Sequence, residues 1–257
     1  MEGSIRLHDV HLEFPIYQSG SRSLKKSLLW HGTGGKVGSD AHNRIVVKAL
    51  DGVTLGLHHG ARVGLIGHNG AGKTTLLRVI AGVYEPLQGR IAVEGRICSL
   101  FNLSFGMNTD ASGIDNIILR GLYLGLSHKQ VLEHLPAIAD YTELGPYLEM
   151  PVRTYSAGMR ARLAFAVSTC IPSEIMLIDE GIIASDVHFL DKAYQRLSRF
   201  MDGTSIVILA SHSADMLRRW CDSAIVMQAG KVMGFGPIDE MLELYMQTGS
   251  GLRSKRE

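Results

Sequence analysis

The sequence lacks an excess of charge, a set of cysteines and a long apolar run, and each absence excludes a class of protein. Its 26 basic and 25 acidic side chains leave a formal net charge of +1 over 257 residues, so nothing indicates nucleic acid as the main partner. No apolar run approaches the ~18–20 residues of a membrane-spanning helix, and the N-terminus carries no signal-peptide pattern. If this protein serves a membrane, we expect it to do so from the cytoplasmic face, through a membrane-embedded partner.

The cysteines are few and unpaired in pattern. Only Cys98, Cys170 and Cys221 occur, far apart and odd in number. This argues against a disulfide or zinc framework and favours reduced core thiols in a cytosolic protein. The 11 histidines are scattered without metal-ligand spacing.

A glycine-rich stretch carries the strongest positive signal. It fits G-x-x-x-x-G-K-[ST] without a gap, follows a short apolar run at 61–66 and precedes a helical pattern at 75–81. Glycines let backbone N–H groups point at an anion, and the helix dipole adds positive charge. Lys73 is suited to β- and γ-phosphates, and the Thr74 hydroxyl to Mg²⁺. The predicted phosphate-binding residues are Gly67, His68, Asn69, Gly70, Ala71, Gly72, Lys73, Thr74 and Thr75.

Buried strands alternate with helices, which predicts an α/β fold with a parallel core. Alternating strands before and after the glycine loop predict an attached antiparallel layer, and residues 104–160 predict an inserted helical lobe in one domain spanning 1–257. Residues 18–44 predict an insertion loop and residues 249–257 a polar tail. Expected strands cover 4–14, 45–57 with a turn at 50–52, 174–179 and 205–210, with hairpins at 89–100 and 224–233; expected helices cover 112–124, 127–141, 156–170 and 186–200, and the last one follows Pro237.

Acidic and imidazole side chains follow two of these strands. Residues 175–178 are apolar and lead directly into Asp179 and Glu180. In a P-loop fold, such an aspartate can hold Mg²⁺ and the next carboxylate can orient or deprotonate a water. His212 follows the strand at 205–210, where open α/β sheets bind ligands. Without the glycine loop, the acids could be a strand leaving the core and the histidine a helix-start residue. With it, we expect the strand ends to converge on one site.

A second anion site is predicted where Ser156, Ala157 and Gly158 open a helix. It lies far along the chain from the glycine loop. A single nucleotide could use both helix N-termini only if two chains meet, so the pattern favours a dimer.

Taken together, the glycine loop, the YSAGM segment, the IMLIDE strand, the Ser185–Asp186 pair and the histidine resemble the nucleotide-binding subunit of an ATP-binding cassette (ABC) transporter, in the family's order and spacing. The resemblance implies a homodimer around two ATP·Mg²⁺, with the signature Ser156, Ala157, Gly158 and Met159 facing ATP on the other protomer. It implies Glu180 as catalytic base, His212 as switch histidine and Asp186 as dimer contact. Thr74 and Asp179 would hold Mg²⁺. Phe14 would stack on adenine, unless it is a core residue of its strand.

Within this family, the chain resembles ATPase subunits of polysaccharide exporters for O-antigen, capsule and teichoic acid. The matching features are Met159, residues 181–186, the insertion after residues 14–17, residues 113–117 and the closing stretch 239–245. The chain is expected to be the short form without a carbohydrate-binding domain. It departs from the family in having Ala157 for a signature glycine and no clear glutamine after Leu100, where Asn102 is the nearest polar candidate for a Mg²⁺ contact.

The resemblance implies a peripheral protein on the cytoplasmic face of the inner membrane, bound to an integral membrane transporter subunit and hydrolysing ATP. Three alternatives stay open: an exporter ATPase for a drug or lipid, a soluble ABC ATPase of translation or DNA repair, and a catalytically silent nucleotide-binding module. The insertion at 18–44 is either a surface loop or a docking element for a partner or lipid surface.

Overall fold

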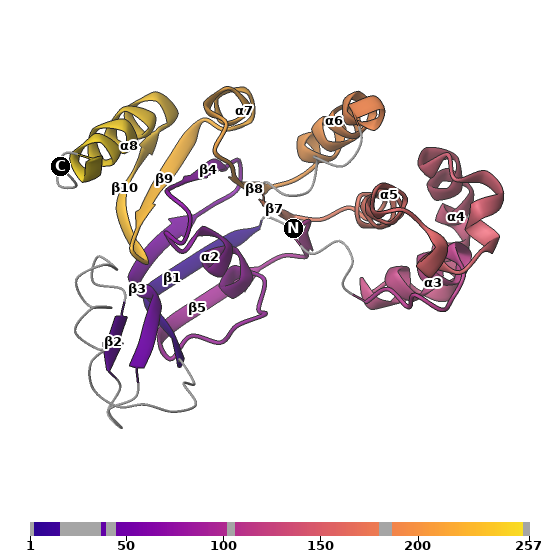
Figure 1. Cartoon of the computed structure of the whole chain (residues 1–257), viewed down its shortest axis with the longest axis horizontal. Helices are drawn as coiled ribbons and strands as arrows, with labels where there is room; N and C mark the ends of the chain where they lie inside the picture. The colour runs from indigo at the N-terminus through magenta and orange to yellow at the C-terminus, as the bar shows by residue number, and fades with distance from the viewer. Residues whose placement is uncertain (1–2, 16–36, 40–44, 102–105, 180–186, 254–257) are drawn as a thin grey trace. The chain divides into compact units, whose positions relative to one another are not determined.

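The computed structural model describes residues 3–15, 37–39, 45–101, 106–179 and 187–253 (Figure 1). Three residues with predicted roles, Glu180, Asp186 and Asn102, lie outside these ranges, as does most of the expected insertion. The chain forms two compact units, one made of Met1–Gly95 with Ser205–Glu257 and the other of Arg96–Thr204. The α/β fold class with an antiparallel layer and a helical part is confirmed.

The first unit contains a four-stranded antiparallel sheet in the order β2 (Val37–Ser39), β3 (Ile45–Leu57), β1 (Ser4–Pro15) and β5 (Gln88–Glu94). Its apolar residues alternate along β1 and β3, as a half-buried strand requires. Ile5 pairs with Leu57 and Leu7 with Leu55, and all four are buried. The short strand β2 lies inside the stretch expected to be a loop.

Strand β3 corrects one prediction, because it runs without a turn at residues 50–52. Leu50 and Val53 both pair with β1, and the two residues between them fall at a shift of register. Gly52 has a φ of +75° there, which glycine adopts without steric penalty. The Asp-Gly pair therefore forms an irregularity within a paired strand, because β1 pairs with β3 on both sides of it.

The expected hairpin at 89–100 is also wrong. Gly95 has a φ of +114° and redirects the chain, but the strands beside it do not pair with each other. β5 pairs antiparallel with β1, whereas β6 (Ile97–Ser99) pairs parallel with β7 (Ile175–Asp179). Each strand takes its partner from far along the sequence.

The first unit also contains the glycine loop, on a second set of strands in the order β10, β9, β4 and β8. β4 (Arg62–Ile66) pairs parallel with β8 (Ile206–Ala210) and with β9 (Ser223–Gln228), and β10 (Lys231–Pro237) returns antiparallel to β9. Every residue of β8 is buried, as expected for a parallel strand covered on both faces.

Helices flank these strands. α2 (Lys73–Ile80) follows the glycine loop, and α7 (Ala214–Trp220) and α8 (Ile238–Arg253) lie together at the upper end of this unit in Figure 1. A Cβ on Gly64 of β4 would lie 2.8 Å from Leu217 of α7 and 3.7 Å from Ile238 of α8. α8 continues through Arg253, so residues 249–253, expected in the polar tail, are helical.

The second unit is mainly helical and contains the expected helical lobe. Its helices are α3 (Gly113–Tyr123), α4 (His128–Thr142), α5 (Ala157–Ser168) and α6 (Val187–Asp202), with 3-10 turns at Gly145–Glu149 and Val152–Thr154. Capping boxes begin α3 and α4: the Ser112 hydroxyl accepts from the Asp115 N–H, and the Ser127 hydroxyl from the Gln130 N–H. Pro136 lies inside α4 without ending it.

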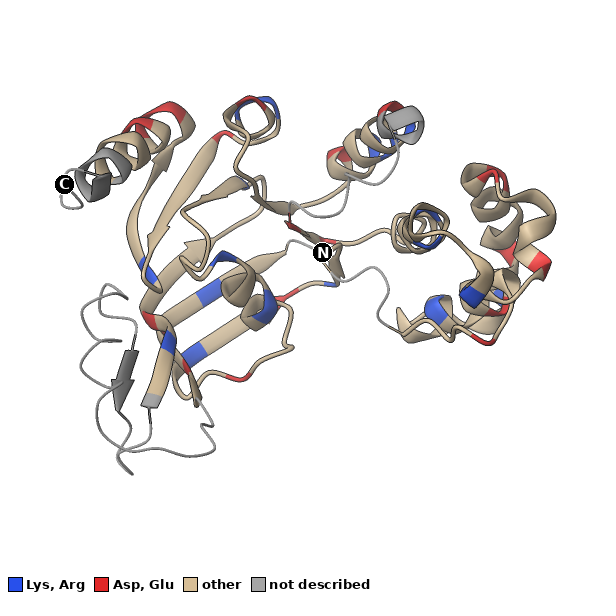
Figure 2. Ribbon diagram, viewed as in Figure 1, with Lys and Arg blue, Asp and Glu red and all other residues tan. Residues whose placement is uncertain are grey.

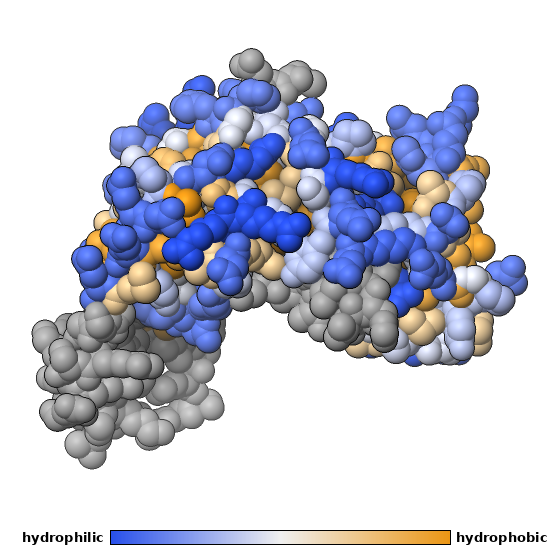
Figure 3. Space-filling model, turned by 90° about the horizontal axis from the view of Figure 1, so that it is seen from above, coloured by the Kyte–Doolittle hydropathy of each residue, from blue (hydrophilic) through white to orange (hydrophobic). Residues whose placement is uncertain are grey.

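The surface is mixed in charge and hydropathy. Basic and acidic residues are interspersed over the ribbon in Figure 2, in keeping with the near-zero net charge. Hydrophilic residues predominate on the face shown in Figure 3, with hydrophobic residues between them. Among the described residues, no helix is both long enough and apolar enough to cross a bilayer.

Candidate functional site

The glycine loop lies between the end of β4 and the start of α2, in the strand–loop–helix context that the sequence predicted. Two of its glycines are required by close backbone contacts. A Cβ on Gly67 would lie 2.4 Å from the carbonyl oxygen of Met227, and one on Gly72 would lie 2.8 Å from that of Ala49, where φ is +111°. A side chain at either position would therefore collide with the backbone of β9 or β3, which glycine avoids.

The Lys73 side chain is buried and turns back over the loop. Its Nζ atom donates to the carbonyl oxygen of Gly67 at 2.5 Å and lies 3.4 Å from Nε2 of His212. This hydrogen bond links the first residue of α2 back to the first residue of the loop. The hydroxyl of Thr74 follows in the half-buried first turn of α2.

His212 reaches this loop because β4 and β8 are parallel neighbours. Leu65 near the end of β4 pairs with Ala210 at the end of β8, so the residues after both strands emerge at the same edge. His212 Nε2 lies 3.1 Å from Asn69 Oδ1. One ring nitrogen cannot donate to Asn69 and accept from Lys73 at once, so the tautomer selects one of the two bonds.

The loop is held from behind by the turn between β9 and β10. The N–H of Gly230 donates to the carbonyl oxygen of Ala71 at 2.9 Å, and the N–H of Asp51 donates to that of Gly230 at 3.0 Å. Asp51 also pairs with Lys48, Lys231 and His11. Burial alone would raise the pKa of Asp51, but the Lys231 hydrogen bond and these neighbouring charges lower it.

Phe14, the predicted adenine contact, is not a core residue, because 37% of it is exposed. Its ring meets the ring of Tyr84 edge-on, with centroids 5.3 Å apart and planes at 71°. Arg78 donates to the Tyr84 hydroxyl at 3.3 Å. Neither Tyr84 nor Arg78 was predicted from the sequence, where the available signal was a tyrosine shortly after the P-loop helix.

In the second unit, the signature residues form the exposed start of α5. Ser156 is the N-cap, and its hydroxyl accepts from the N–H of Met159 at 3.1 Å. Ala157 and Gly158 supply the first helical turn, whose N–H groups have no partner within the helix. Tyr155, just before them, is buried and donates to the carbonyl oxygen of Tyr147. The predicted second anion site is therefore a helix N-terminus anchored by a buried tyrosine.

Asp179 is the last residue of β7, at the end of a strand whose other residues are buried. This agrees with a carboxylate presented at a strand end.

Cys98 of the neighbouring strand β6 is buried, and burial raises its pKa to about 12. Its thiol donates to the carbonyl oxygen of Ser168 at 3.4 Å, which agrees with the predicted reduced core cysteine.

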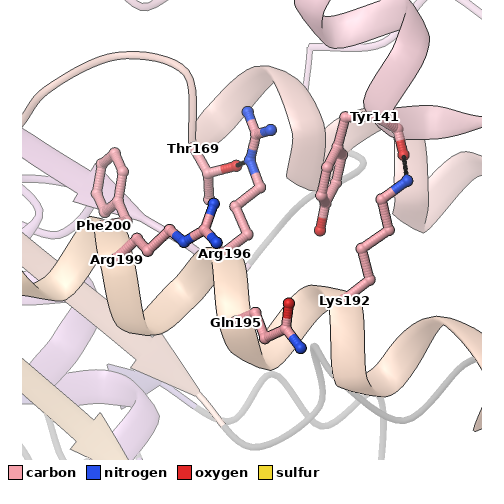
Figure 4. Close-up of a pocket in the computed structure, with 7 residues that line it drawn as sticks. All are labelled: Tyr141, Thr169, Lys192, Gln195, Arg196, Arg199 and Phe200. Carbon is pink, nitrogen blue, oxygen red and sulfur yellow. Dashed lines mark hydrogen bonds between the residues drawn. The ribbon is translucent and has the colours of Figure 1, made fainter.

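A cavity of about 460 Å³ also lies in the second unit (Figure 4). Two cations of α6 cross it to the C-terminal ends of other helices. Lys192 donates to the carbonyl oxygen of Tyr141 at 3.1 Å and pairs with Glu143. The lining residues are Tyr141, Thr169, Lys192, Gln195, Arg196, Arg199 and Phe200.

Arg196 bonds to the C-terminal end of α5 and packs on Tyr141. It donates from Nε to the Thr169 hydroxyl at 2.6 Å and from Nη2 to the carbonyl oxygen of Ala166 at 3.1 Å, with its Cζ 4.0 Å from the centre of the Tyr141 ring. Burial lowers the pKa of Arg196 and raises that of Tyr141 to about 12. Cations at helix C-termini are favourable, so this cluster serves as a junction that ties α6 to α4 and α5.

The glycine loop has the chemistry of a nucleotide site. Its glycines let the loop pack directly against the backbone of β3 and β9, Lys73 supplies a cation, and Thr74 supplies a hard oxygen ligand. These residues fit a triphosphate with a Mg²⁺ ion that takes most of its remaining ligands from phosphate and water.

Comparison with protein families and relatives agrees with this chemistry. A family model described as "ABC transporter" matches residues 50–182. The O-antigen export system ATP-binding protein RfbE of Yersinia enterocolitica is 40% identical over 89% of this chain and 96% of that protein. RfbB of Myxococcus xanthus, also an O-antigen export ATP-binding protein, is 38% identical over 79% of this chain and 46% of that protein. The teichoic acids export ATP-binding protein TagH of Lactococcus lactis is 35% identical over 81% of this chain and 45% of that protein.

Solved structures share the fold at low identity. An ABC transporter ATP-binding subunit superimposes with a TM-score of 0.68 at 20% identity, covering 94% of this chain and 92% of that one. A dimeric ATP-binding cassette with bound ADP and phosphate superimposes with a TM-score of 0.66 at 19% identity, covering 91% and 98%.

Proposed function

The chain belongs to the ABC transporter family of ATP-binding proteins, and from this premise we propose that it powers the export of a lipid-linked polysaccharide of the O-antigen or capsule type across the inner membrane. The observation that carries the proposal is the 40% identity over 96% of an O-antigen export ATP-binding protein. The geometry of the glycine loop supports the choice of residues that we propose contact ATP.

In this proposal the loop N–H groups and Lys73 bind the β- and γ-phosphates. In the structure, Lys73 donates to the neutral carbonyl oxygen of Gly67. A phosphate oxygen could take the place of this carbonyl and form a stronger, charge-assisted hydrogen bond with Lys73. Thr74 and Asp179 hold Mg²⁺, which neutralises phosphate charge when bound. Asn102 remains the proposed further contact to Mg²⁺. His212, poised against Asn69 and Lys73, contacts the γ-phosphate or the attacking water.

Hydrolysis requires groups from two protomers in this proposal. Ser156, Ala157, Gly158 and Met159 present the exposed N-terminus of α5 to ATP held by the other protomer, where N–H groups and the helix dipole favour a phosphate. Glu180 is the catalytic base and Asp186 a contact between protomers. ATP binding closes the homodimer and hydrolysis reopens it.

The remaining partner is an integral membrane subunit. We place the ATPase dimer at the cytoplasmic face of the inner membrane, peripheral to the bilayer and bound to that subunit. The polysaccharide would pass through the membrane partner, so the ATPase need not contact the sugar. One nucleotide-binding domain spanning 1–257 would perform the cycle.

The Glu180→Gln substitution tests the enzymatic part. It should lower the hydrolysis rate by about 10²-fold or more, the typical contribution of a positioned base, while ATP still binds and an ATP-bound dimer accumulates. Glu149→Gln, at an exposed 3-10 residue, is the matched control. Turnover at the control rate in Glu180→Gln would remove Glu180 from the mechanism.

An export assay tests the substrate class separately. Cells whose only copy carries Lys73→Ala should retain lipid-linked polysaccharide on the cytoplasmic side and lose it from the surface. Normal surface polysaccharide in such cells, with ATPase activity abolished in the purified variant, would assign the transporter to another substrate and leave the ATPase function intact.

A further inference from the structure

The aromatic pair at the end of β1 has a feature that the phosphate site does not explain. Phe14 lies beyond the part of β1 that pairs with β5 and is partly exposed, yet the ring of Tyr84 meets its ring edge-on, with centroids 5.3 Å apart. Tyr84 is itself half-buried and receives a hydrogen bond from Arg78, whose Cζ lies 5.9 Å from the centre of the Tyr84 ring. The three side chains form a chain of contacts from α2 to β1.

The two outer members of this set of contacts, Arg78 and Phe14, lie on elements next to the phosphate loop. Arg78 lies on α2, the helix that begins at Lys73. Phe14 pairs with Val47 on β3, two residues before Ala49, whose carbonyl oxygen closes over Gly72. Phe14 is therefore connected to α2 and β3, the two elements that lie against the phosphate loop.

Backbone hydrogen bonds hold the segment that carries Tyr84. After α2, the N–H of Val83 donates to the carbonyl oxygen of Arg78 at 2.8 Å. Further on, the N–H of Leu87 donates to that of His11 on β1 at 2.8 Å. Tyr84 lies between these two anchor points, so its ring is presented to Phe14 by a short connection fixed at both ends.

We propose that Tyr84, held by Arg78, is a positioning residue that orients the Phe14 ring for a nucleobase. This inference rests on the proposed ATP site and deepens it. A nucleobase is a planar aromatic ligand, and a ring already ordered by an edge-on neighbour loses less conformational freedom when the base stacks on it. Tyr84 need not touch the nucleotide; it acts through Phe14.

The test compares ligands with and without a base. Binding of ATP and of inorganic tripolyphosphate is measured by calorimetry on the full chain with Mg²⁺, for the parent protein, Tyr84→Ala, Tyr84→Phe and Phe14→Ala. Tyr84→Ala should weaken ATP binding about 2- to 12-fold, the value of one aromatic pair, and leave tripolyphosphate binding unchanged. Tyr84→Phe keeps the ring contact but loses the hydroxyl that accepts from Arg78, so its ATP affinity should lie between those of the parent protein and Tyr84→Ala. Val83→Ala, at a neighbouring exposed position, is the control expected to change neither ligand.

The outcomes separate this inference from the function on which it rests. If the parent protein binds neither ligand, the ATP site itself is wrong. If Phe14→Ala weakens ATP binding and Tyr84→Ala does not, the positioning role is overturned while the ATP site stands. Equal weakening of both ligands in a folded Tyr84→Ala protein would also overturn it, because Tyr84 would then act on the phosphate loop.

Discussion

The Nζ atom of Lys73 lies 3.4 Å from Nε2 of His212, although the two residues are 139 positions apart in the sequence. The parallel pairing of β4 with β8 produces this approach, since both strands end at one edge of the sheet. Asn69 Oδ1 lies 3.1 Å from the same imidazole nitrogen. A γ-phosphate bound by Lys73 would therefore meet an imidazole already oriented by the loop.

Replacing His212 tests this arrangement. His212→Ala should lower kcat for ATP hydrolysis by about 10²-fold, because an oriented group near the reacting phosphate is lost. ATP affinity should change little, since Lys73 and the loop backbone stay in place. His59→Ala, at an exposed turn, is the control. A His212→Ala protein with an unchanged kcat would show that the contact has no catalytic role.

The tight backbone at Gly67 predicts a steric effect on nucleotide binding. Gly67→Ala would place its Cβ 2.4 Å from the carbonyl oxygen of Met227. The loop must then shift, which should lower the free energy of unfolding by about 1–3 kcal/mol and abolish measurable ATP binding. Gly56→Ala, whose Cβ would have nothing within 4 Å, should leave both unchanged. Thermal unfolding measures the first effect and calorimetry the second. Tight ATP binding by Gly67→Ala would contradict the requirement for glycine at this position.

The helix junction in the second unit predicts a stability effect separate from nucleotide binding. Arg196→Met removes the bonds to Thr169 and to the Ala166 carbonyl. It should lower the free energy of unfolding by about 1–3 kcal/mol, since two buried acceptors lose a charged donor. Arg199→Met, which lines the same cavity from an exposed position, is the matched control. Equal denaturant midpoints for the two variants would show that the junction contributes nothing.

Asp51 predicts a loss of stability in acid. Its pKa is lower in the folded protein than its ordinary value, although burial opposes this, because Lys231, Lys48 and His11 favour the carboxylate. Its stabilising contribution is therefore complete above the unfolded-state pKa of about 3.9 and is lost as pH falls through the lower folded-state pKa. Thermal unfolding of Asp51→Asn should depend less on pH below about pH 4 than that of the parent protein. Identical pH curves for Asp51→Asn and the parent protein would refute the prediction.

Features that depend on neighbouring residues could be predicted from the sequence. The glycine loop, the helix starts at Ser112, Ser127 and Ser156, and the buried strands at β7 and β8 all appear where the pattern placed them. In each case the signal is local: a short side chain meets an amide three residues on, or an apolar run avoids water. These interactions are complete within about one helical turn or one strand.

Strand pairing was not predictable in the same way. A hairpin was expected at 89–100, but β5 pairs with β1 and β6 with β7. A turn was expected at residues 50–52, but β3 pairs with β1 on both sides of them. Turn residues allow the chain to change direction but do not determine which strand pairs with which. The pairing strand is determined by distant segments that bury the same face of the sheet.

The sequence by itself determined the chemistry of this protein: a phosphate-binding loop with a lysine, acids and a histidine after buried strands, and a second helix N-terminus. Only the tertiary structure decided which of these groups meet. It set His212 against Asn69 and Lys73, and Tyr84 between Arg78 and Phe14. The physical reason is that spacing along the chain specifies local backbone geometry, whereas contacts between distant residues follow from which strands and helices bury their apolar faces together.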